Sequence, residues 1–385
     1  MKLTIDSRRL RELADWAAKI APARPNPPIL GGVLLDADGL GTLSATTTDY
    51  DVWGVGQVPA DAIGAGRVLV SARLLSDLAS GMPTGPVELV LDGSRLTIRG
   101  GRAVATAPTM QVEDYPVPPE RDGGSVLHAP GPLLSRVLGT ATKIAANANP
   151  ADGLHVILDA TPESLRITAS DKYRILACDL PWSGQGPDGP LSAMLPGPAA
   201  QALADLVKAT DTAALSFPAA GGVFGATAAE RQLTVRQMAG GKRIPVERFA
   251  GTKPHEFAVS RDELADLVER AGKRCVDKMP LRLTVADSTL TAVGGTDDEG
   301  SLTDVIGVTD DSTWPADGME IGVRPDYLAS MLAVCPAETV RVGATKPHLA
   351  VVLTPVGVDL PYAMTGVIMP YNLGKLPAPT AKGAK

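Results

Sequence analysis

The feature that most constrains this chain is an internal repeat of about 130 residues that occurs three times. A short strand, an amphipathic helix and several further strands begin near Lys2, and the same order begins again near Ser125 and near Glu256. A segment of this length can bury its own core, unlike a solenoid repeat of roughly 20 to 50 residues. The 385 residues are therefore predicted to form three similar globular domains in a row.

Two amphipathic helices are predicted in each repeat, because apolar residues recur there at intervals of three and four positions. One of them opens with Ser260 and Glu263, which form a capping-box pattern. The six helices are expected around Leu10–Ala17 behind an N-cap at Asp6 or Ser7, and over Ser71–Ser80, Gly131–Ala145, Pro198–Ala209, Ser260–Cys275 and Arg324–Val334.

Strand patterns lie between these helices, and turn dipeptides such as Asp38-Gly39 and Asp92-Gly93 separate several of them. The strands are expected at Ile29–Asp36, Thr42–Thr47, Val87–Leu91, Arg95–Arg99, Leu154–Asp159, Ser164–Ala169, Leu281–Val285 and Leu290–Val293. Helices and strands in this arrangement predict an α+β fold, with sheet on one side and helices on the other.

Composition excludes several classes of protein. The chain is 44% hydrophobic and 21% charged, and apolar runs such as Val351–Leu353 are far shorter than the ~20 residues of a membrane-spanning helix. The N-terminal region carries Lys2 and Asp6 in place of an apolar signal segment, so a cytoplasmic location is expected. The three cysteines are widely spaced without a CxxC pair, which argues against a disulfide framework and a zinc site.

Catalytic and metal-binding patterns are weak in this sequence. The four histidines are scattered, and the acidic run Asp297–Glu299 lacks the alternating spacing of a calcium loop. The net charge of −7 would count against nucleic-acid binding unless the basic residues gather on one face. We therefore expect a binding protein without catalytic residues, metal or cofactor.

Six runs of sequence, taken in chain order, resemble one known family. They are PILGGVLLDADGLGTLSATTTDYDVW (Pro28–Trp53), VLVSARLLSDLASGMP (Val68–Pro83), EDYPVPPE (Glu113–Glu120), ASDKYRILA (Ala169–Ala177), MEIGVRPDYLASML (Met319–Leu332) and VIMPY (Val367–Tyr371). They are similar to the first-domain strand pair and second helix, the interdomain linker, the second-domain loop, and the third-domain helix and last strand of bacterial DNA polymerase III beta subunits, the sliding clamps. Each run is short, but the ordered set spans nearly the whole chain.

The resemblance implies the DNA clamp fold: α+β, with three tandem similar domains that each have two helices packed on antiparallel sheets. The domains are expected at residues 1–118, 125–250 and 255–373, and a disordered tail rich in Pro, Ala and Lys is expected at 374–385. One subunit would form half of a ring. A head-to-tail homodimer would close the ring around double-stranded DNA.

The implied function is that of a sliding clamp, or processivity factor, which encircles DNA without reading its sequence. It would tether DNA polymerase, clamp loader and repair proteins, each through a short clamp-binding peptide. A topological link requires little affinity, so an acidic chain with a modest basic lining is compatible with this function. The implied location is the cytoplasm, at the nucleoid.

Three sets of site residues follow from the resemblance. The DNA-contacting set consists of Arg24, Arg73, Lys143, Asn147 and Asn149. The partner-peptide pocket consists of Ser170, Lys172, Tyr173, Arg174, Ile175, Pro245, Arg324, Tyr327, His348, Val367, Ile368, Met369, Pro370 and Tyr371. The dimer edge consists of Ala105 and Ala107 in the first domain and Gly272 and Lys273 in the third.

The chain departs from the family at several of these places. Lys172 and Tyr173 replace the usual Gly-His pair, and the dimer edge has small or polar residues where clamps place bulky aliphatic ones. These departures predict that the ring closes more weakly than in a typical clamp. They also leave an alternative open, namely a clamp-like paralogue that binds peptides but seldom encircles DNA.

Overall fold

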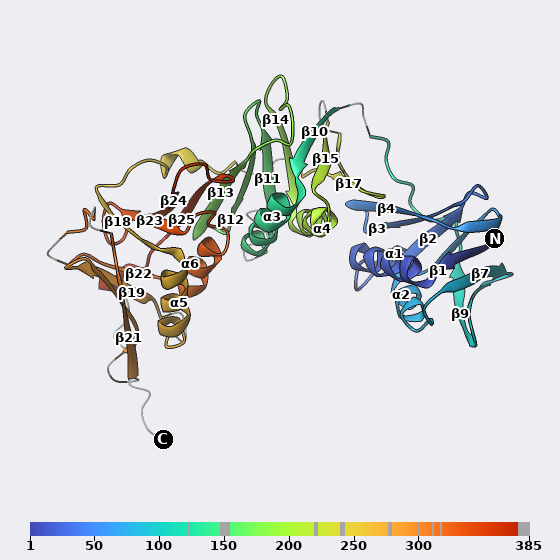
Figure 1. The fold of residues 1–385 in the computed structure, drawn as a ribbon, viewed down its shortest axis with the longest axis horizontal. Helices are drawn as coiled ribbons and strands as arrows, with labels where there is room; N and C mark the ends of the chain where they lie inside the picture. Colours follow the sequence, from blue (N-terminus) through green and yellow to red (C-terminus); the bar gives the residue numbers. More distant parts are fainter. Residues whose placement is uncertain are drawn as a thin grey trace. The chain divides into compact units, whose positions relative to one another are not determined.

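The structure is a computed structural model that describes residues 1–121, 124–146, 155–218, 222–238, 243–275, 279–296, 298, 300–309, 312–315 and 318–375. The chain folds into two compact units (Figure 1). The first unit contains Met1–Ser135 and Trp182–Ala239, and the second contains Arg136–Pro181 and Gly240–Lys385. Helices and antiparallel strands make up both units, which confirms the predicted α+β class.

A 13-stranded sheet forms the framework of the first unit, in the order β10-β15-β16-β17-β4-β3-β2-β6-β9-β8-β7-β1-β5. Its strands are β1 (Lys2–Asp6), β2 (Gly32–Ala37), β3 (Thr42–Thr48), β4 (Val52–Pro59), β5 (Asp61–Gly64), β6 (Gly66–Ser71), β7 (Pro86–Asp92), β8 (Arg95–Gly100), β9 (Ala103–Met110), β10 (Ser125–Pro130), β15 (Thr212–Phe217), β16 (Val223–Ala228) and β17 (Arg231–Arg236). The unit also contains β14 (Leu191–Pro196).

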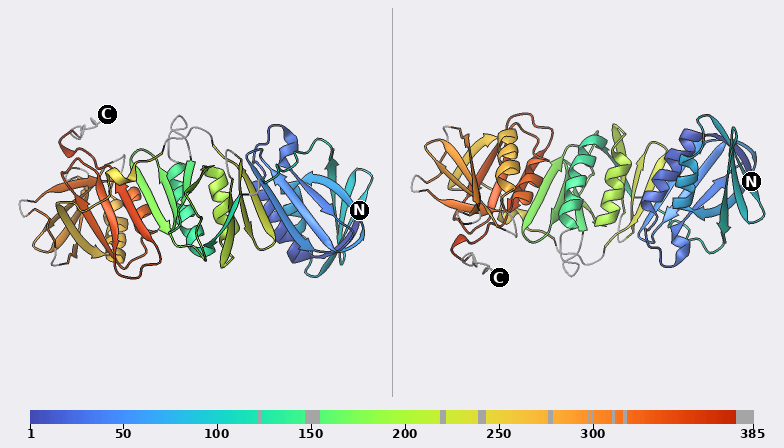
Figure 2. Two further views of the ribbon diagram at one scale, coloured as in Figure 1. Left: turned by 90° about the horizontal axis from the view of Figure 1, so that it is seen from above. Right: turned by 90° about the horizontal axis from the view of Figure 1, so that it is seen from below.

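The helices α1 (Ser7–Ile20) and α2 (Ala72–Ser80) lie side by side in the first unit, and α1 packs on β3 and β4 (Figures 1 and 2). Asp6 caps α1 by accepting hydrogen bonds from the backbone N–H groups of Arg8 and Arg9. The apolar stripe of α1 is buried, with Leu10 and Leu13 at most 1% exposed, so the predicted periodicity identified the core face. The same unit contains α4 (Gly197–Val207).

Two sheets form the framework of the second unit. In one, the strands follow the order β11-β12-β13-β25-β24-β23-β18, and in the other the order β21-β20-β19-β22. The strands are β11 (His155–Ala160), β12 (Leu165–Ser170), β13 (Arg174–Leu180), β18 (His255–Ser260), β19 (Leu281–Ala286), β20 (Thr289–Thr296), β21 (Gly300–Gly307), β22 (Glu320–Val323), β23 (Thr339–Ala344), β24 (Val351–Val356) and β25 (Ala363–Ile368).

The helices α5 (Arg261–Gly272) and α6 (Pro325–Leu332) pack against each other in the second unit, and α6 contacts β25 (Figures 1 and 2). Ser260 caps α5 by accepting a hydrogen bond from the N–H of Glu263, as the capping-box pattern predicts. The remaining helix, α3 (Gly131–Ala145), begins at the end of the first unit and continues in the second. There Arg136 donates to the carbonyl of Ala333, just after α6.

Two residues of the segment between β9 and β10, Tyr115 and Arg121, fix that segment to the first unit. The Tyr115 hydroxyl donates to the carbonyl of Gly32 at 2.8 Å, and its ring packs among Leu34 and Leu69. Burial raises the pKa of Tyr115 to about 12. The Arg121 guanidinium donates to the Thr234 hydroxyl at 3.0 Å, and lies across Gly225, where a side chain would displace it. The segment is therefore held at both ends by side chains that point inward.

The helix predictions are accurate to within three residues at each end, and α3 has the predicted limits. The strand prediction at Ile29–Asp36 is wrong at its start, because Pro28–Gly31 forms a 3₁₀ helix (η1) and β2 begins only at Gly32. Two prolines precede this turn, and the Leu30 N–H bonds to the carbonyl of Pro27 instead of to a neighbouring strand. Two further 3₁₀ turns are η3 (Val246–Arg248) and η4 (Leu373–Lys375). None of the helices described is long and apolar enough to span a membrane.

Candidate functional site

The turn between β12 and β13 forms one wall of the candidate site in the second unit. The Asp171 carboxylate accepts hydrogen bonds from the backbone N–H groups of Tyr173 (3.1 Å) and Arg174 (3.0 Å). The Ser170 hydroxyl donates to the Arg174 carbonyl at 2.9 Å. Lys172 has a φ of 75°, in the left-handed region, as the tight turn requires. The side chain of Lys172 is exposed, and that of Tyr173 is 60% exposed.

Arg174 is buried beneath this turn and has partners on three sides. Its Nε donates to Asp171 Oδ2 at 2.8 Å, and the two side chains are only 5% and 1% exposed. Its Nη1 donates to the Ser330 hydroxyl of α6 at 2.8 Å. Its Cζ also lies 4.4 Å from the centroid of the Tyr327 ring. These contacts tie the turn to α6.

Arg324, just before α6, contacts the same aromatic ring. Its Cζ also lies 4.4 Å from the centroid of the Tyr327 ring. Its guanidinium forms a bidentate salt bridge with Asp326, in which Nε donates to Oδ1 at 2.9 Å and Nη2 donates to Oδ2 at 2.6 Å. Burial raises the pKa of the Tyr327 hydroxyl, and the nearby Asp171 carboxylate raises it further. The pKa of Tyr371 is likewise raised by burial, while the Arg324 charge opposes that shift.

The C-terminal end of β25 joins the same region. The Met369 N–H donates to the carbonyl of Tyr173 at 2.7 Å, and the Tyr371 N–H donates to the carbonyl of Gly322 at 2.8 Å. Val367 and Ile368 are buried, whereas Met369 is 40% exposed. The structure therefore brings together the predicted residues of the turn, of α6 and of this strand.

The other predicted residues of the pocket lie around this centre. Ile175 is half-buried opposite Val367 on the neighbouring strand. Pro370 is half-buried and follows Met369 directly. His348 lies in the exposed turn before β24, whose first residue, Val351, pairs with Ile368. These positions surround the end of β25.

A cavity of about 220 Å³ lies beside the predicted Pro245, on the face of the sheet that carries Thr168. It is lined by Ile157, Asp159, Arg166, Thr168, Arg243, Ile244, Pro245, Val246 and Glu247. Ion pairs hold the segment 243–247 over the sheet: Arg166 bonds Asp179 at 2.6 Å and Glu247 at 2.8 Å, and Arg243 bonds Asp159 at 2.9 Å. The hydrogen bonds that Arg166 donates to the Asp179 carboxylate raise the pKa of Arg166.

Sequence reasoning missed several residues of this site. Asp171 and Ser330 orient Arg174, and Ile157 and Thr168 line the cavity, but none of these was predicted. Alternation along β11 and β12 could have identified Ile157 and Thr168 as residues of one face. The role of Ser330 depends on a contact between distant segments, and no local pattern signals it.

The predicted DNA-contacting residues are exposed wherever the structure describes them. Arg24 lies between α1 and η1, Arg73 lies in the first turn of α2, and Lys143 lies in the last turn of α3. Asn147 and Asn149 belong to a segment that is not among the described residues. The role of this set in DNA contact stays a prediction.

The predicted dimer-edge residues have packing roles in the subunit itself. Ala107 is fully buried and Ala105 half-buried, while the neighbouring Val104 is 64% exposed. A Cβ added at Gly272 would lie 2.9 Å from the Cβ of Pro325, so a glycine lets α5 approach α6. Lys273 pairs with Glu269 at 3.3 Å.

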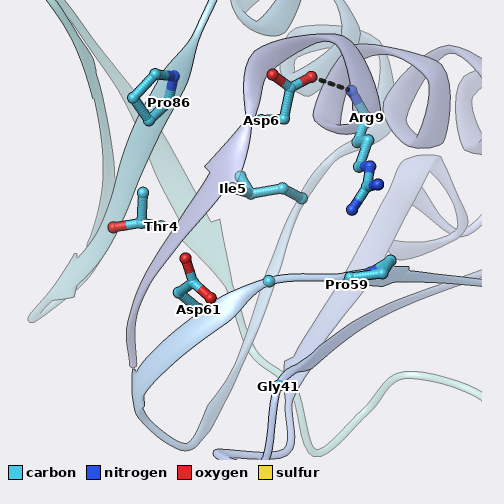
Figure 3. A pocket seen from close by; sticks show the side chains of 9 residues that line it. Thr4, Ile5, Asp6, Arg9, Gly41, Pro59, Asp61 and Pro86 are labelled. Carbon is cyan, nitrogen blue, oxygen red and sulfur yellow. Dashed lines mark hydrogen bonds between the residues drawn. The ribbon is translucent and has the colours of Figure 1, made fainter.

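A further hollow of about 340 Å³ lies in the first unit, between β1, β5 and the start of α1 (Figure 3). It is lined by Thr4, Ile5, Asp6, Arg9, Gly41, Pro59, Ala60, Asp61 and Pro86, none of which is a predicted site residue. Two of the lining residues, Asp6 and Asp61, are acidic and one, Arg9, is basic. Asp6 already caps α1 by accepting a hydrogen bond from the Arg9 backbone N–H. Within the described residues, no group of three or more His, Cys, Asp and Glu side chains could hold a metal ion.

Comparison with known proteins shows similarity along nearly the whole chain. The family model described as DNA polymerase III beta subunit, N-terminal domain, matches residues 1–119. The beta sliding clamp of Streptomyces coelicolor is 29% identical over 388 residues, which cover 97% of this chain and 100% of that protein. The beta sliding clamp of Micrococcus luteus is 24% identical over 323 residues, which cover 80% and 99%.

A solved structure shows the same fold. The sliding clamp (DNA polymerase III subunit beta) of Pseudomonas aeruginosa bound to griselimycin matches with a TM-score of 0.86 at 23% identity, over 97% of this chain and 100% of that one. The fold is therefore that of the DNA clamps. The chain's first 119 residues match the family model of the DNA polymerase III beta subunit N-terminal domain, and the whole chain is similar to beta sliding clamps.

Proposed function

We propose that this protein is a sliding clamp, which encircles double-stranded DNA as a head-to-tail homodimer and tethers DNA polymerase, clamp loader and repair proteins. The observation that carries this proposal is the convergence of the Ser170–Ile175 turn, the start of α6 and the end of β25 in one site. These are the segments whose sequences resemble the partner pocket of the family. A processivity factor of this kind acts by holding its partners, so no catalytic residue is expected.

The site suits peptides that carry apolar side chains. Ile175 and Met369 offer aliphatic and thioether surface, and Tyr173 is exposed beside them. Methionine adapts its shape to different partners, which suits a site that several proteins share. The buried Asp171–Arg174 pair beneath the turn keeps this surface in place before a peptide arrives.

The cations Arg24, Arg73 and Lys143 would contact DNA phosphates without reading bases. All three are exposed. If each neutralises one phosphate, replacing one of them with glutamine should reduce the slope of log affinity against log salt by about 0.9. Such a protein would act at the nucleoid, in the cytoplasm.

Two sheet edges support the head-to-tail dimer. Residues Ala103–Pro108 of β9 pair with β8 on one side, and β9 meets β6 only through Thr109 and Met110. In the second unit, β21 is the edge strand of its sheet, and Val305 on it is 55% exposed. Two such edges can pair between subunits. With little apolar surface on β9, we expect weak ring closure, and a dimer that persists at nanomolar protein in sedimentation would contradict this.

We further propose three domains at residues 1–118, 125–250 and 255–373, with a flexible tail at 374–385. The repeated order of a strand followed directly by a helix at β1–α1, β10–α3 and β18–α5 supports these limits. Tyr115 supports the first limit, because it packs on Leu34 and Leu69 of the first domain.

The proposed function is tested by loading the protein onto a nicked circular plasmid with a cognate clamp loader. A ring should stay on the circle, leave when the plasmid is cut once, and stay again when bulky proteins block both ends. Retention that is unchanged by cutting would indicate direct binding instead of encirclement. No retention on the closed circle would favour the paralogue that only binds peptides.

A further inference from the structure

The C-terminal end of α6 is held by side chains from three other elements. Three consecutive carbonyl groups there, those of Ala333, Val334 and Cys335, each accept a hydrogen bond from one of these side chains. In that order, the donors are Arg136 Nη2 at 3.1 Å, the Tyr362 hydroxyl, and Arg261 Nη1 at 3.3 Å. Carbonyls at the end of a helix lack donors within the helix, so these three bonds fix the place where α6 ends.

Arg136 differs from the other two donors in its origin and its charge. Arg261 is the first residue of α5 and Tyr362 lies just before β25, so both belong to the same proposed domain as α6, whereas Arg136 lies on α3 of the proposed second domain. Arg261 is also paired with Asp262 at 2.8 Å. Among the described residues, no carboxylate is paired with Arg136. Its full positive charge therefore acts on the negative end of the α6 dipole.

The preceding turns of α6 form part of the candidate site. Tyr327 and Ser330 both contact the Arg174 guanidinium, beneath the turn between β12 and β13. The Ser330 hydroxyl also donates to the Tyr327 carbonyl at 2.7 Å, which fixes it to the helix. Ser330 precedes Ala333 by three residues, or about 4.5 Å along the helix axis. A shift of α6 at Ala333 would therefore move the partners of Arg174.

The Arg174 turn and α6 lie on opposite sides of the proposed domain boundary. The sheet crosses this boundary where β13 pairs with β25, with Arg174 opposite Ile368. The bond from Arg136 to Ala333 joins the helices across the same boundary. Both connections lie within the second unit. The position of α6 relative to the turn therefore depends on this helix contact as well as on the sheet.

We propose that Arg136 is a positioning residue of the peptide site. By holding the end of α6 from the second domain, it keeps Tyr327 and Ser330 against Arg174, and so keeps the turn that carries Tyr173 in the conformation that binds a peptide. Arg136 acts through α6 and does not contact the peptide itself. This inference rests on the proposed function, because it needs a peptide in the site.

The test measures affinity by calorimetry with two probes, griselimycin and a capped hexapeptide of Leu and Phe. Arg136 is exposed, so Arg136→Gln should fold as the wild type does. It should bind each probe about threefold more weakly, which is the size expected for one charge at a helix end. Lys208→Gln removes an exposed cation at the end of α4 and serves as the control for charge alone. It should bind both probes as tightly as the wild type.

A double-mutant cycle with Ser330→Ala distinguishes positioning from a general structural role. If Arg136 acts through α6, adding Arg136→Gln to Ser330→Ala should weaken binding by less than about 1.5-fold, because the bond from the helix to Arg174 is already lost. Two independent structural losses would multiply instead. The inference is overturned if the losses multiply, or if Lys208→Gln weakens binding as much as Arg136→Gln does.

The wild type separates this inference from the proposed function. If it binds a probe and Arg136→Gln binds that probe equally well, only the role of Arg136 is overturned. If the wild type binds neither probe, the peptide site is refuted, and the role of Arg136 with it.

Discussion

Arg174 and Arg324 contact the same ring in the same way but lie in opposite environments. Each guanidinium carbon is 4.4 Å from the centroid of Tyr327, and each arginine is paired with an aspartate. The Arg174–Asp171 pair is 5% and 1% exposed, whereas the Arg324–Asp326 pair is 36% and 56% exposed. Water can replace the partner of an exposed charge but not that of a buried one. The difference should therefore lie in what each pair contributes to stability.

Asp171→Asn should have the largest effect, because it leaves the Arg174 charge buried without its counter-ion. We expect a loss of about 3–5 kcal/mol in local stability. Amide hydrogen exchange in β13 and α6 would measure this loss. A change below about 1 kcal/mol would show that burial does not distinguish the two pairs.

Ser330→Ala should have an intermediate effect. It removes the hydroxyl that accepts from Arg174 Nη1 at 2.8 Å and leaves the buried ion pair intact. A hydrogen bond to a charged group contributes about 1.5–3 kcal/mol. Exchange should accelerate mainly in α6, and an equal acceleration throughout the second unit would contradict this link between the turn and the helix.

Asp326→Asn is the matched control on the exposed side and should cost less than about 1 kcal/mol. The effect should shrink further at 1 M salt, where the screening length is about 3 Å. The Asp171→Asn effect should persist at the same salt concentration. If both variants respond equally to salt, the buried pair is reached by solvent.

The Tyr327 hydroxyl should matter only at alkaline pH. Because burial raises its pKa above the ordinary value of 10, folding favours the neutral phenol. The resulting stability is fully present below pH 10 and is lost as pH rises through the folded-state pKa. The wild type should therefore lose stability relative to Tyr327→Phe above pH 10. Parallel pH profiles of the two proteins would contradict this.

The local elements of this fold could be predicted well from the sequence, because they depend on neighbours in the chain. The limits of α3 and the caps at Ser260 and Asp6 follow from side chains within one or two turns. The 3₁₀ turn before β2 was missed, because the apolar residues Ile29 and Leu30 fit a strand equally well. The predicted pocket residues depended on a resemblance to a family and not on any local pattern.

The sequence by itself determined the helical faces and the helix caps, and it predicted the threefold repeat. Periodicity and turn chemistry act over a few residues, and they leave a signal that can be read along the chain. Only the tertiary structure decided that Arg174 is buried against Ser330, that Ala107 faces the core and that Arg136 holds the end of α6. Burial and pairing of this kind depend on which distant segments meet, and spacing along the chain does not record that.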